Sequence, residues 1–100
     1  MLNIKGDKTP IQITTNIKEY AEALAEGFHI AWTSSSADIT AIGQPLEGKG
    51  FMYEIIKSTG QPIQIIAIPF SGDNNIYVLR KHGSTWRPWV EFSGNPLGGG

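Results

Sequence analysis

The sequence predicts an α+β fold in which one N-terminal helix packs on an antiparallel sheet of about five strands, preceded by an extended N-terminal arm. Three observations lead to this prediction. Apolar residues recur at helical spacing only in residues 16–26. After Gly27 the apolar pattern changes to alternation, which is the period of a strand. Short turn sequences separate the later apolar runs, as they do in hairpins.

The predicted helix covers residues 16–26. Its apolar face consists of residues spaced i, i+3, i+4 and i+7, namely Ile17, Tyr20, Ala21 and Leu24. Thr15 or Asn16 can cap the N-terminus of this helix, and Asn16 with Glu19 has the spacing of a capping box.

The predicted strands follow the helix. In residues 28–33 the side chains alternate, with Phe28, Ile30 and Trp32 on one face and His29, Ala31 and Thr33 on the other. Residues 34–50 are rich in Gly, Ser and Pro and are predicted to form a long loop. Further strands are expected at about 51–58, 62–70, 75–81 and 85–92, joined by turns that suit antiparallel hairpins.

The run at residues 63–70 is apolar on both faces, which is typical of a central strand covered on both sides. A single helix cannot cover much of both faces of the sheet, so something else must contribute, and a second copy of the chain is one candidate. The expected organisation is an attachment arm at residues 1–14, a folded domain at residues 15–93 and a flexible tail at residues 94–100. The arm has no core of its own, so we expect it to be ordered only against another chain.

Composition excludes several classes of protein. The chain has 100 residues, enough for one domain, and a net charge of −1. This balance argues against a nucleic-acid partner, since nucleic-acid binders carry a basic surplus. The absence of Cys excludes disulfides and thiolate metal sites. No apolar run approaches the roughly 20 residues that span a bilayer, and the N-terminal residues are polar, so no membrane insertion is expected.

The sequence shows no convergent set of reactive groups. Its two histidines, His29 and His82, have no metal-ligand spacing, and residues 48–50 lack the rest of a phosphate-binding loop. Asp38 and Glu47 lie in the predicted loop, where solvation is the simpler interpretation. We therefore expect that the protein is not an enzyme and that it has no catalytic, cofactor-binding or metal-binding residue.

Aromatic and basic residues gather in the last predicted hairpin. Trp86 and Trp89 are three residues apart, so in a regular strand they point to opposite faces, and Trp86 is expected to be the more exposed. Arg80 is expected to lie on an aromatic ring near Tyr77. The candidate residues for binding a surface or a partner are Trp86, Arg80, Arg87 and His82. Two interpretations remain for the basic residues: they are solvated at the end of the hairpin, or they contact an anionic glycan or a phosphate. Two also remain for each Trp: it packs in the core or an interface, or it stacks on a carbohydrate.

The order of these features resembles the knob-type domains of bacteriophage tail fibres and of pyocin-like bacteriocin particles. The matching stretches are Leu24-Ala-Glu-Gly-Phe-His-Ile30, Gln44-Pro45, Gln61-Pro-Ile-Gln64, Tyr77-Val-Leu-Arg80 and Gly83-Ser-Thr-Trp86-Arg-Pro-Trp89. The similarity covers roughly residues 16–92, and its specificity comes from the order and spacing of the motifs.

This resemblance implies a virion structural protein, a small fibre or appendage component that is assembled in the host cytoplasm. Its implied partners are other copies of itself in a homotrimer, other virion proteins bound through the N-terminal arm, and a bacterial surface glycan. The resemblance implies no catalytic residue and no cofactor. A free-standing carbohydrate-binding module is the alternative function.

Overall fold

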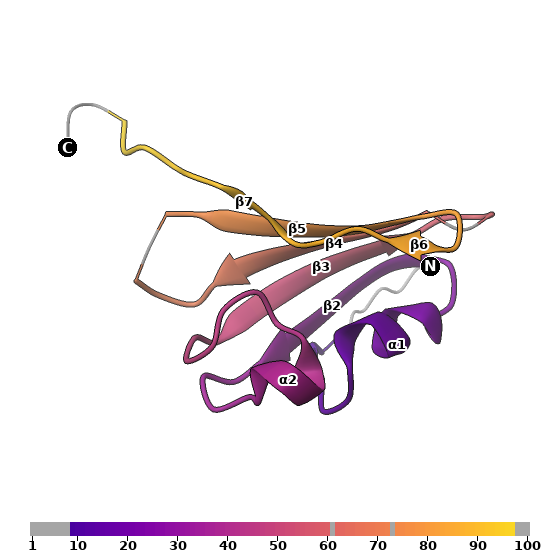
Figure 1. Ribbon diagram of the computed structural model, residues 1–100, viewed down its shortest axis with the longest axis horizontal. Coiled ribbons are helices and arrows are strands. Elements are labelled where there is room, and N and C mark those ends of the chain that lie inside the picture. The colour runs from indigo at the N-terminus through magenta and orange to yellow at the C-terminus, as the bar shows by residue number, and fades with distance from the viewer. Residues whose placement is uncertain (1–8, 61, 73, 98–100) are drawn as a thin grey trace.

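The computed structural model describes residues 9–60, 62–72 and 74–97, and these residues form an α+β fold. Within them, a mixed sheet of seven strands carries two short helices on one of its faces (Figure 1). The elements are β1 (Ile11–Gln12), α1 (Ile17–Glu22), β2 (Gly27–Thr33), α2 (Ile39–Ile42), β3 (Phe51–Lys57), β4 (Ile63–Pro69), β5 (Ile76–His82), β6 (Thr85–Trp86) and β7 (Val90–Phe92). No helix in these ranges is long and apolar enough to cross a membrane.

The sheet has the order β1-β2-β3-β4-β5-β6, and β7 also pairs with β5. The pairs from β2 onward are antiparallel, as the short turns predict, but β1 runs parallel to β2. The prediction of a five-stranded antiparallel sheet is therefore wrong in strand number and in the direction of β1. The reason for the second error is that Ile11 pairs with Ala31, beyond the whole of α1, and local periodicity does not report such distant pairing.

A bulge divides the last predicted strand, residues 85–92, into β6 and β7. Lys81 pairs with Trp86, whereas Val78 pairs with Val90. Three steps along β5 (81 to 78) thus match four steps along the other segment (86 to 90), which is the signature of one inserted residue. Pro88 lies in this interval and has no N–H to donate to the ladder. The insertion reverses the face to which the following residues point.

The N-cap of helix α1 is Asn16, one of the two predicted capping residues. The Asn16 Oδ1 atom accepts hydrogen bonds from the backbone N–H groups of Lys18 (2.9 Å) and Glu19 (3.4 Å). The helix ends at Glu22, four residues before the predicted end at residue 26. The Lys57 Nζ atom donates to the carbonyl oxygens of Glu22 (2.6 Å) and Leu24 (2.7 Å), and so provides partners for carbonyls at and beyond this end.

Helix α2 corrects the prediction of a single helix, because it lies inside the predicted loop at residues 34–50. The Asp38 side chain caps it by accepting from the Thr40 N–H (3.0 Å), and Gly43 ends it with a left-handed φ of +84°. A helix of four residues is too short to produce a visible helical period in the sequence.

The core lies between the sheet and the two helices. Its buried side chains come from alternate positions of the strands and from both helices, namely Ile13, Ile17, Ala21, Ala31, Ile42, Phe51, Tyr53, Ile55, Ile63, Ile65, Ala67, Tyr77 and Leu79. The Tyr53 hydroxyl shares a 2.8 Å hydrogen bond with the buried Thr33 hydroxyl, and burial raises the pKa of Tyr53 to about 12.

The two ends of the chain lie partly outside the described residues. Of the expected arm, residues 1–8 lie outside them, while Ile11–Gln12 join the sheet as β1 and Ile13 is 2% exposed. The last residues of the arm therefore pack on the chain's own core. Of the expected tail, residues 98–100 lie outside the described ranges, and Gly94 N–H donates to Asn75 Oδ1 at 3.2 Å.

Candidate functional site

The side of the sheet that faces away from both helices is a broad apolar surface, which we call the open face. Residues paired in register share a face, so the ladder pairs define its members. It consists of Phe28, Ile30, Trp32, Met52, Glu54, Ile56, Gln64, Ile66, Ile68, Ile76, Val78, Arg80, Val90 and Phe92. The sequence-predicted face of Phe28, Ile30 and Trp32 is part of it, so that alternation is confirmed.

Large side chains of the open face are exposed to a degree that is unusual for a sheet. Phe28 and Phe92 are each 53% exposed, and five others (Met52, Ile56, Ile68, Ile76 and Val90) are 36–48% exposed. At about 200 Å² for a fully exposed large side chain, these seven present roughly 600 Å² of largely apolar surface. That area is at the top of the range for the largest patch on a monomer, and such patches mark interaction sites.

The open face extends past the end of β4. Phe70 N–H donates to the Gly50 carbonyl at 3.1 Å, which continues the β3–β4 ladder by one pair. A Cβ on Gly50 would lie 2.9 Å from Phe70 Cδ2, so the ring covers this glycine while remaining 55% exposed.

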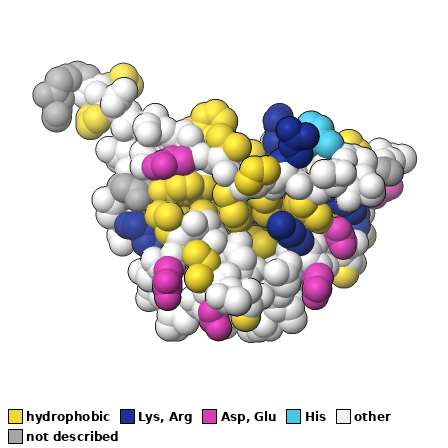
Figure 2. Space-filling model, viewed as in Figure 1, with side chains coloured by type: hydrophobic (Ala, Val, Ile, Leu, Met, Phe, Trp, Pro, Cys, Tyr) yellow, Lys and Arg dark blue, Asp and Glu magenta, His cyan; other side chains and the backbone are white. Residues whose placement is uncertain are grey.

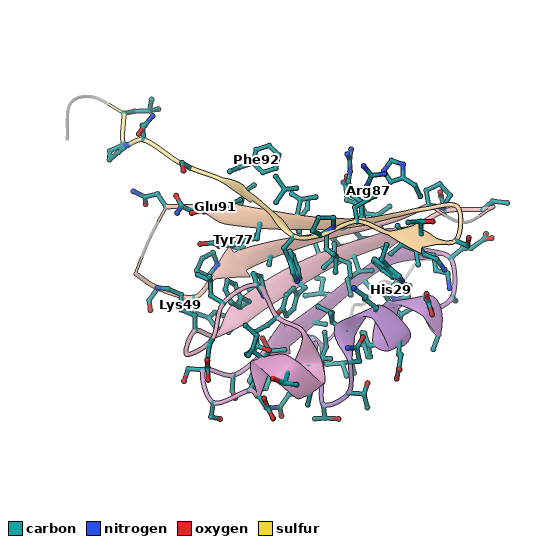
Figure 3. All side chains as sticks on the ribbon, viewed as in Figure 1. His29, Lys49, Tyr77, Arg87, Glu91 and Phe92 are labelled. Atoms are coloured by element: carbon teal, nitrogen blue, oxygen red, sulfur yellow. The ribbon has the colours of Figure 1, made fainter. Side chains whose placement is uncertain are left out.

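Three of the four predicted binding residues meet at the edge of the open face. Arg80, His82 and Arg87 line a hollow of about 280 Å³ together with Val78, Pro88 and Val90. The Arg87 N–H donates to the Arg80 carbonyl at 2.8 Å, which places the two arginines opposite each other across the β5–β6 ladder. In Figure 3, Arg87 and Phe92 lie on the side of the sheet away from the helices. Figure 2 shows basic side chains beside a histidine on the upper surface, next to hydrophobic side chains.

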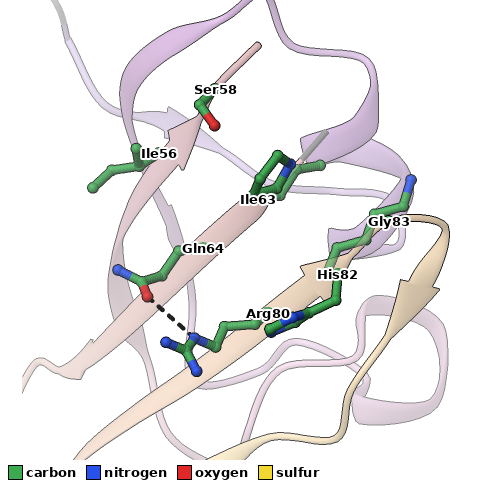
Figure 4. Close-up of a pocket in the computed structure, with 9 residues that line it drawn as sticks. Ile56, Ser58, Ile63, Gln64, Arg80, His82 and Gly83 are labelled. Carbon is green, nitrogen blue, oxygen red and sulfur yellow. Dashed lines mark hydrogen bonds between the residues drawn. The ribbon is translucent and has the colours of Figure 1, made fainter. Parts of the chain in front are cut away.

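A second hollow, of about 350 Å³, lies on the other side of Arg80. It is lined by Ile56, Ser58, Pro62, Ile63, Gln64, Arg80, Lys81, His82 and Gly83 (Figure 4). Arg80 Nε donates to Gln64 Oε1 at 3.3 Å, which orients the guanidinium along the open face and leaves its remaining N–H groups available. Arg80 and His82 thus border both hollows.

The expectation that Arg80 stacks near Tyr77 is wrong. Tyr77 and Arg80 are three residues apart in a regular strand and face opposite sides, so Tyr77 is buried in the core while Arg80 is exposed. The cation nearest an indole ring is instead Lys81, whose Nζ lies 6.0 Å from the Trp86 ring centroid.

Trp86, the fourth predicted residue, lies on the helix side of the sheet and outside the basic cluster. Its Nε1 donates to Glu22 Oε2 at 2.8 Å, and Lys81 Nζ lies 3.0 Å from the same oxygen. The hydrogen bond from Trp86, and secondarily that from Lys81, holds the pKa of the Glu22 carboxyl below its usual value. Trp86 therefore ties β6 to the end of α1.

Trp89 lies on the same side as Trp86, so the prediction that the two Trp face opposite sides is wrong. Trp89 Nε1 donates to the Gly43 carbonyl at 2.8 Å, and its ring lies 6.5 Å from that of Tyr53. Both indoles are half-buried and pack against the core. The bulge between β6 and β7 is the cause, because one inserted residue brings positions three apart to one face.

No group of three or more His, Asp or Glu residues within the described ranges is placed to hold a metal ion. Gln44 is 2% exposed, and its side-chain Nε2 donates to the Ala37 carbonyl at 2.8 Å. This hydrogen bond joins the residues that follow α2 to those that precede it.

Comparisons with protein-family models, with curated proteins and with solved structures find no match for this chain.

Proposed function

We propose that this chain is a structural component of a phage fibre or appendage, or of a related particle, whose knob-type domain assembles with other copies through the open face. The observation that carries the proposal is the roughly 600 Å² of largely apolar side-chain surface on the side of the sheet that the helices leave bare. A component built into a particle has that surface covered by its neighbours, whereas a free monomer would leave it in water.

The order of sequence motifs supports the same class. The stretches that resemble knob-type domains lie between α1 and β2 and on β2 itself, just after α2, at the start of β4, on β5, and from the β5–β6 turn to Trp89. In this proposal the copies form a homotrimer, the N-terminal residues attach it to other virion proteins, and the particle is assembled in the host cytoplasm. Display of many copies on one particle would make weak contacts with a bacterial surface glycan effective through avidity.

The alternative, a free-standing carbohydrate-binding module, has one observation in its favour. Arg80, His82 and Arg87 line an exposed hollow of about 280 Å³, and the two guanidinium groups suit the carboxylate of an acidic sugar. Against it, the indole N–H groups of Trp86 and Trp89 are engaged with Glu22 and Gly43, and both rings pack against the core. Neither ring is a free stacking platform.

The test is the molar mass of the full chain in solution by light scattering. Assembly predicts three times the chain mass of 10.9 kDa at high concentration, while a carbohydrate-binding module predicts 10.9 kDa and retention on an acidic-glycan column. A monomer at all concentrations would refute the assembly proposal.

A further inference from the structure

The open face contains an acidic side chain at its centre. Glu54 is on β3, between its register partners Ile30 on β2 and Ile66 on β4. Its neighbours along β3 on the same face are Met52 and Ile56. Glu54 is half-buried, and within the described residues it forms no ion pair and no side-chain hydrogen bond.

This carboxylate restricts what can cover the open face. Burying a charge without a partner is costly, and an interface that leaves one unpaired loses much of the gain from its apolar contacts. Any occupant of the face must therefore bring a hydrogen-bond donor, preferably a cation, to Glu54. A purely apolar surface does not satisfy this requirement.

The chain itself has such a cation on the same face. Arg80 is on β5, two strands away from Glu54 with β4 between them, so the backbones are separated by about 10 Å and the two side chains do not pair within the chain. Arg80 is exposed and bound only through Nε to Gln64, and its neighbour Arg87 has no carboxylate partner among the described residues. The face thus presents an unpaired acid and two unpaired bases.

We infer that the open face is covered by another copy of this chain and that Glu54 of one copy pairs with Arg80 of the next. This inference rests on the proposed function and specifies its central contact. Charge complementarity supports it, since each copy supplies both members of the pair and the contact repeats around any closed assembly. Area supports it too, because roughly 600 Å² from the most exposed side chains alone approaches the ~800 Å² per partner of a stable interface.

The experiment measures the self-association constant of the full chain by sedimentation over a dilution series. Glu54→Gln keeps the side-chain shape, and Arg80→Gln leaves a shorter polar side chain. Each change removes one charge, and we expect each to weaken association by at least about tenfold. Glu54→Arg and Arg80→Glu should weaken it further, and the double reversal should restore association to within about tenfold of the wild type. Glu47→Arg is the matched control, because Glu47 is exposed in the segment between α2 and β3 and should leave association unchanged.

Circular dichroism of each variant checks that the fold is retained. Loss of association in both single reversals together with recovery in the double variant supports the pair. Unchanged association in Glu54→Gln and Arg80→Gln, or no recovery in the double reversal, overturns the Glu54–Arg80 contact while self-association still supports the proposed function. A wild-type chain that stays monomeric at all concentrations overturns the proposed function itself.

Discussion

The loss of the Trp89 side chain should be among the most destabilising single changes in this domain. Trp89, directly before β7, contacts the end of α2 through its hydrogen bond to Gly43 and the sheet through the ring of Tyr53 on β3. Truncating a fully buried Trp to Ala costs about 3–5 kcal/mol. Because Trp89 is half-buried, we expect about 2–4 kcal/mol for Trp89→Ala, out of a total stability of about 5–15 kcal/mol for a domain.

The conservative change Trp89→Phe separates packing from hydrogen bonding. It retains most of the ring contact but removes the donor to the Gly43 carbonyl, which should cost about 1 kcal/mol. Urea unfolding followed by circular dichroism is the suitable assay, because the substitution removes a fluorophore. A Trp89→Ala variant with the wild-type unfolding midpoint would refute the helix-side placement of Trp89, and with it the bulge that puts Trp89 there.

Other predictions follow from the same structure. Gly50→Ala should cost about 1–2 kcal/mol in urea unfolding, since the new methyl group would lie 3.2 Å from the Thr33 carbonyl oxygen as well as against Phe70; an unchanged midpoint would contradict that contact. Burial raises the pKa of Tyr53 to about 12 in the folded chain, so the hydroxyl loses its proton at lower pH in the unfolded chain. The free energy of unfolding should therefore fall by about 1.4 kcal/mol per pH unit between pH 10 and 12. This slope should be absent in Tyr53→Phe. The pKa of Glu22 is lowered in the folded chain, so its contribution to stability should be present above pH 4.5 and be lost as the pH falls through the folded pKa. Glu22→Gln should reduce this loss of stability in acid. The same loss in both proteins would argue against the contact with Trp86.

The sequence predicts the elements that depend on local pattern. The Asn16 cap, the alternation in residues 28–33 and the order of the antiparallel hairpins are all readable from neighbouring residues. It does not predict the parallel pairing of β1 with β2, because Ile11 and Ala31 become partners only when the chain has folded. Nor does it predict α2, which rests on a single capped turn ended by Gly43.

The candidate site was predictable in part for similar reasons. Arg80, His82 and Arg87 do line one hollow, since residues of one hairpin lie close together whatever its exact register. Trp86 does not join them, because its pairing with Lys81 puts it on the helix side of the sheet, and the residues of β6 alone do not fix that register. Glu54 was missed because a lone acid in an alternating strand looks like a solvent-facing residue until the surrounding strands show it lying among Ile30 and Ile66.

A polar substitution on the open face tests whether other copies of the chain cover that face. Phe28 and Phe92 are each 53% exposed, so replacing both with Ser removes little of the core of a single copy. Light scattering across a dilution series should show an assembly of wild-type chains and a 10.9 kDa monomer for the folded Phe28→Ser, Phe92→Ser variant. A wild-type protein that is already monomeric at high concentration, or a double variant that assembles as well as the wild type, would contradict the account.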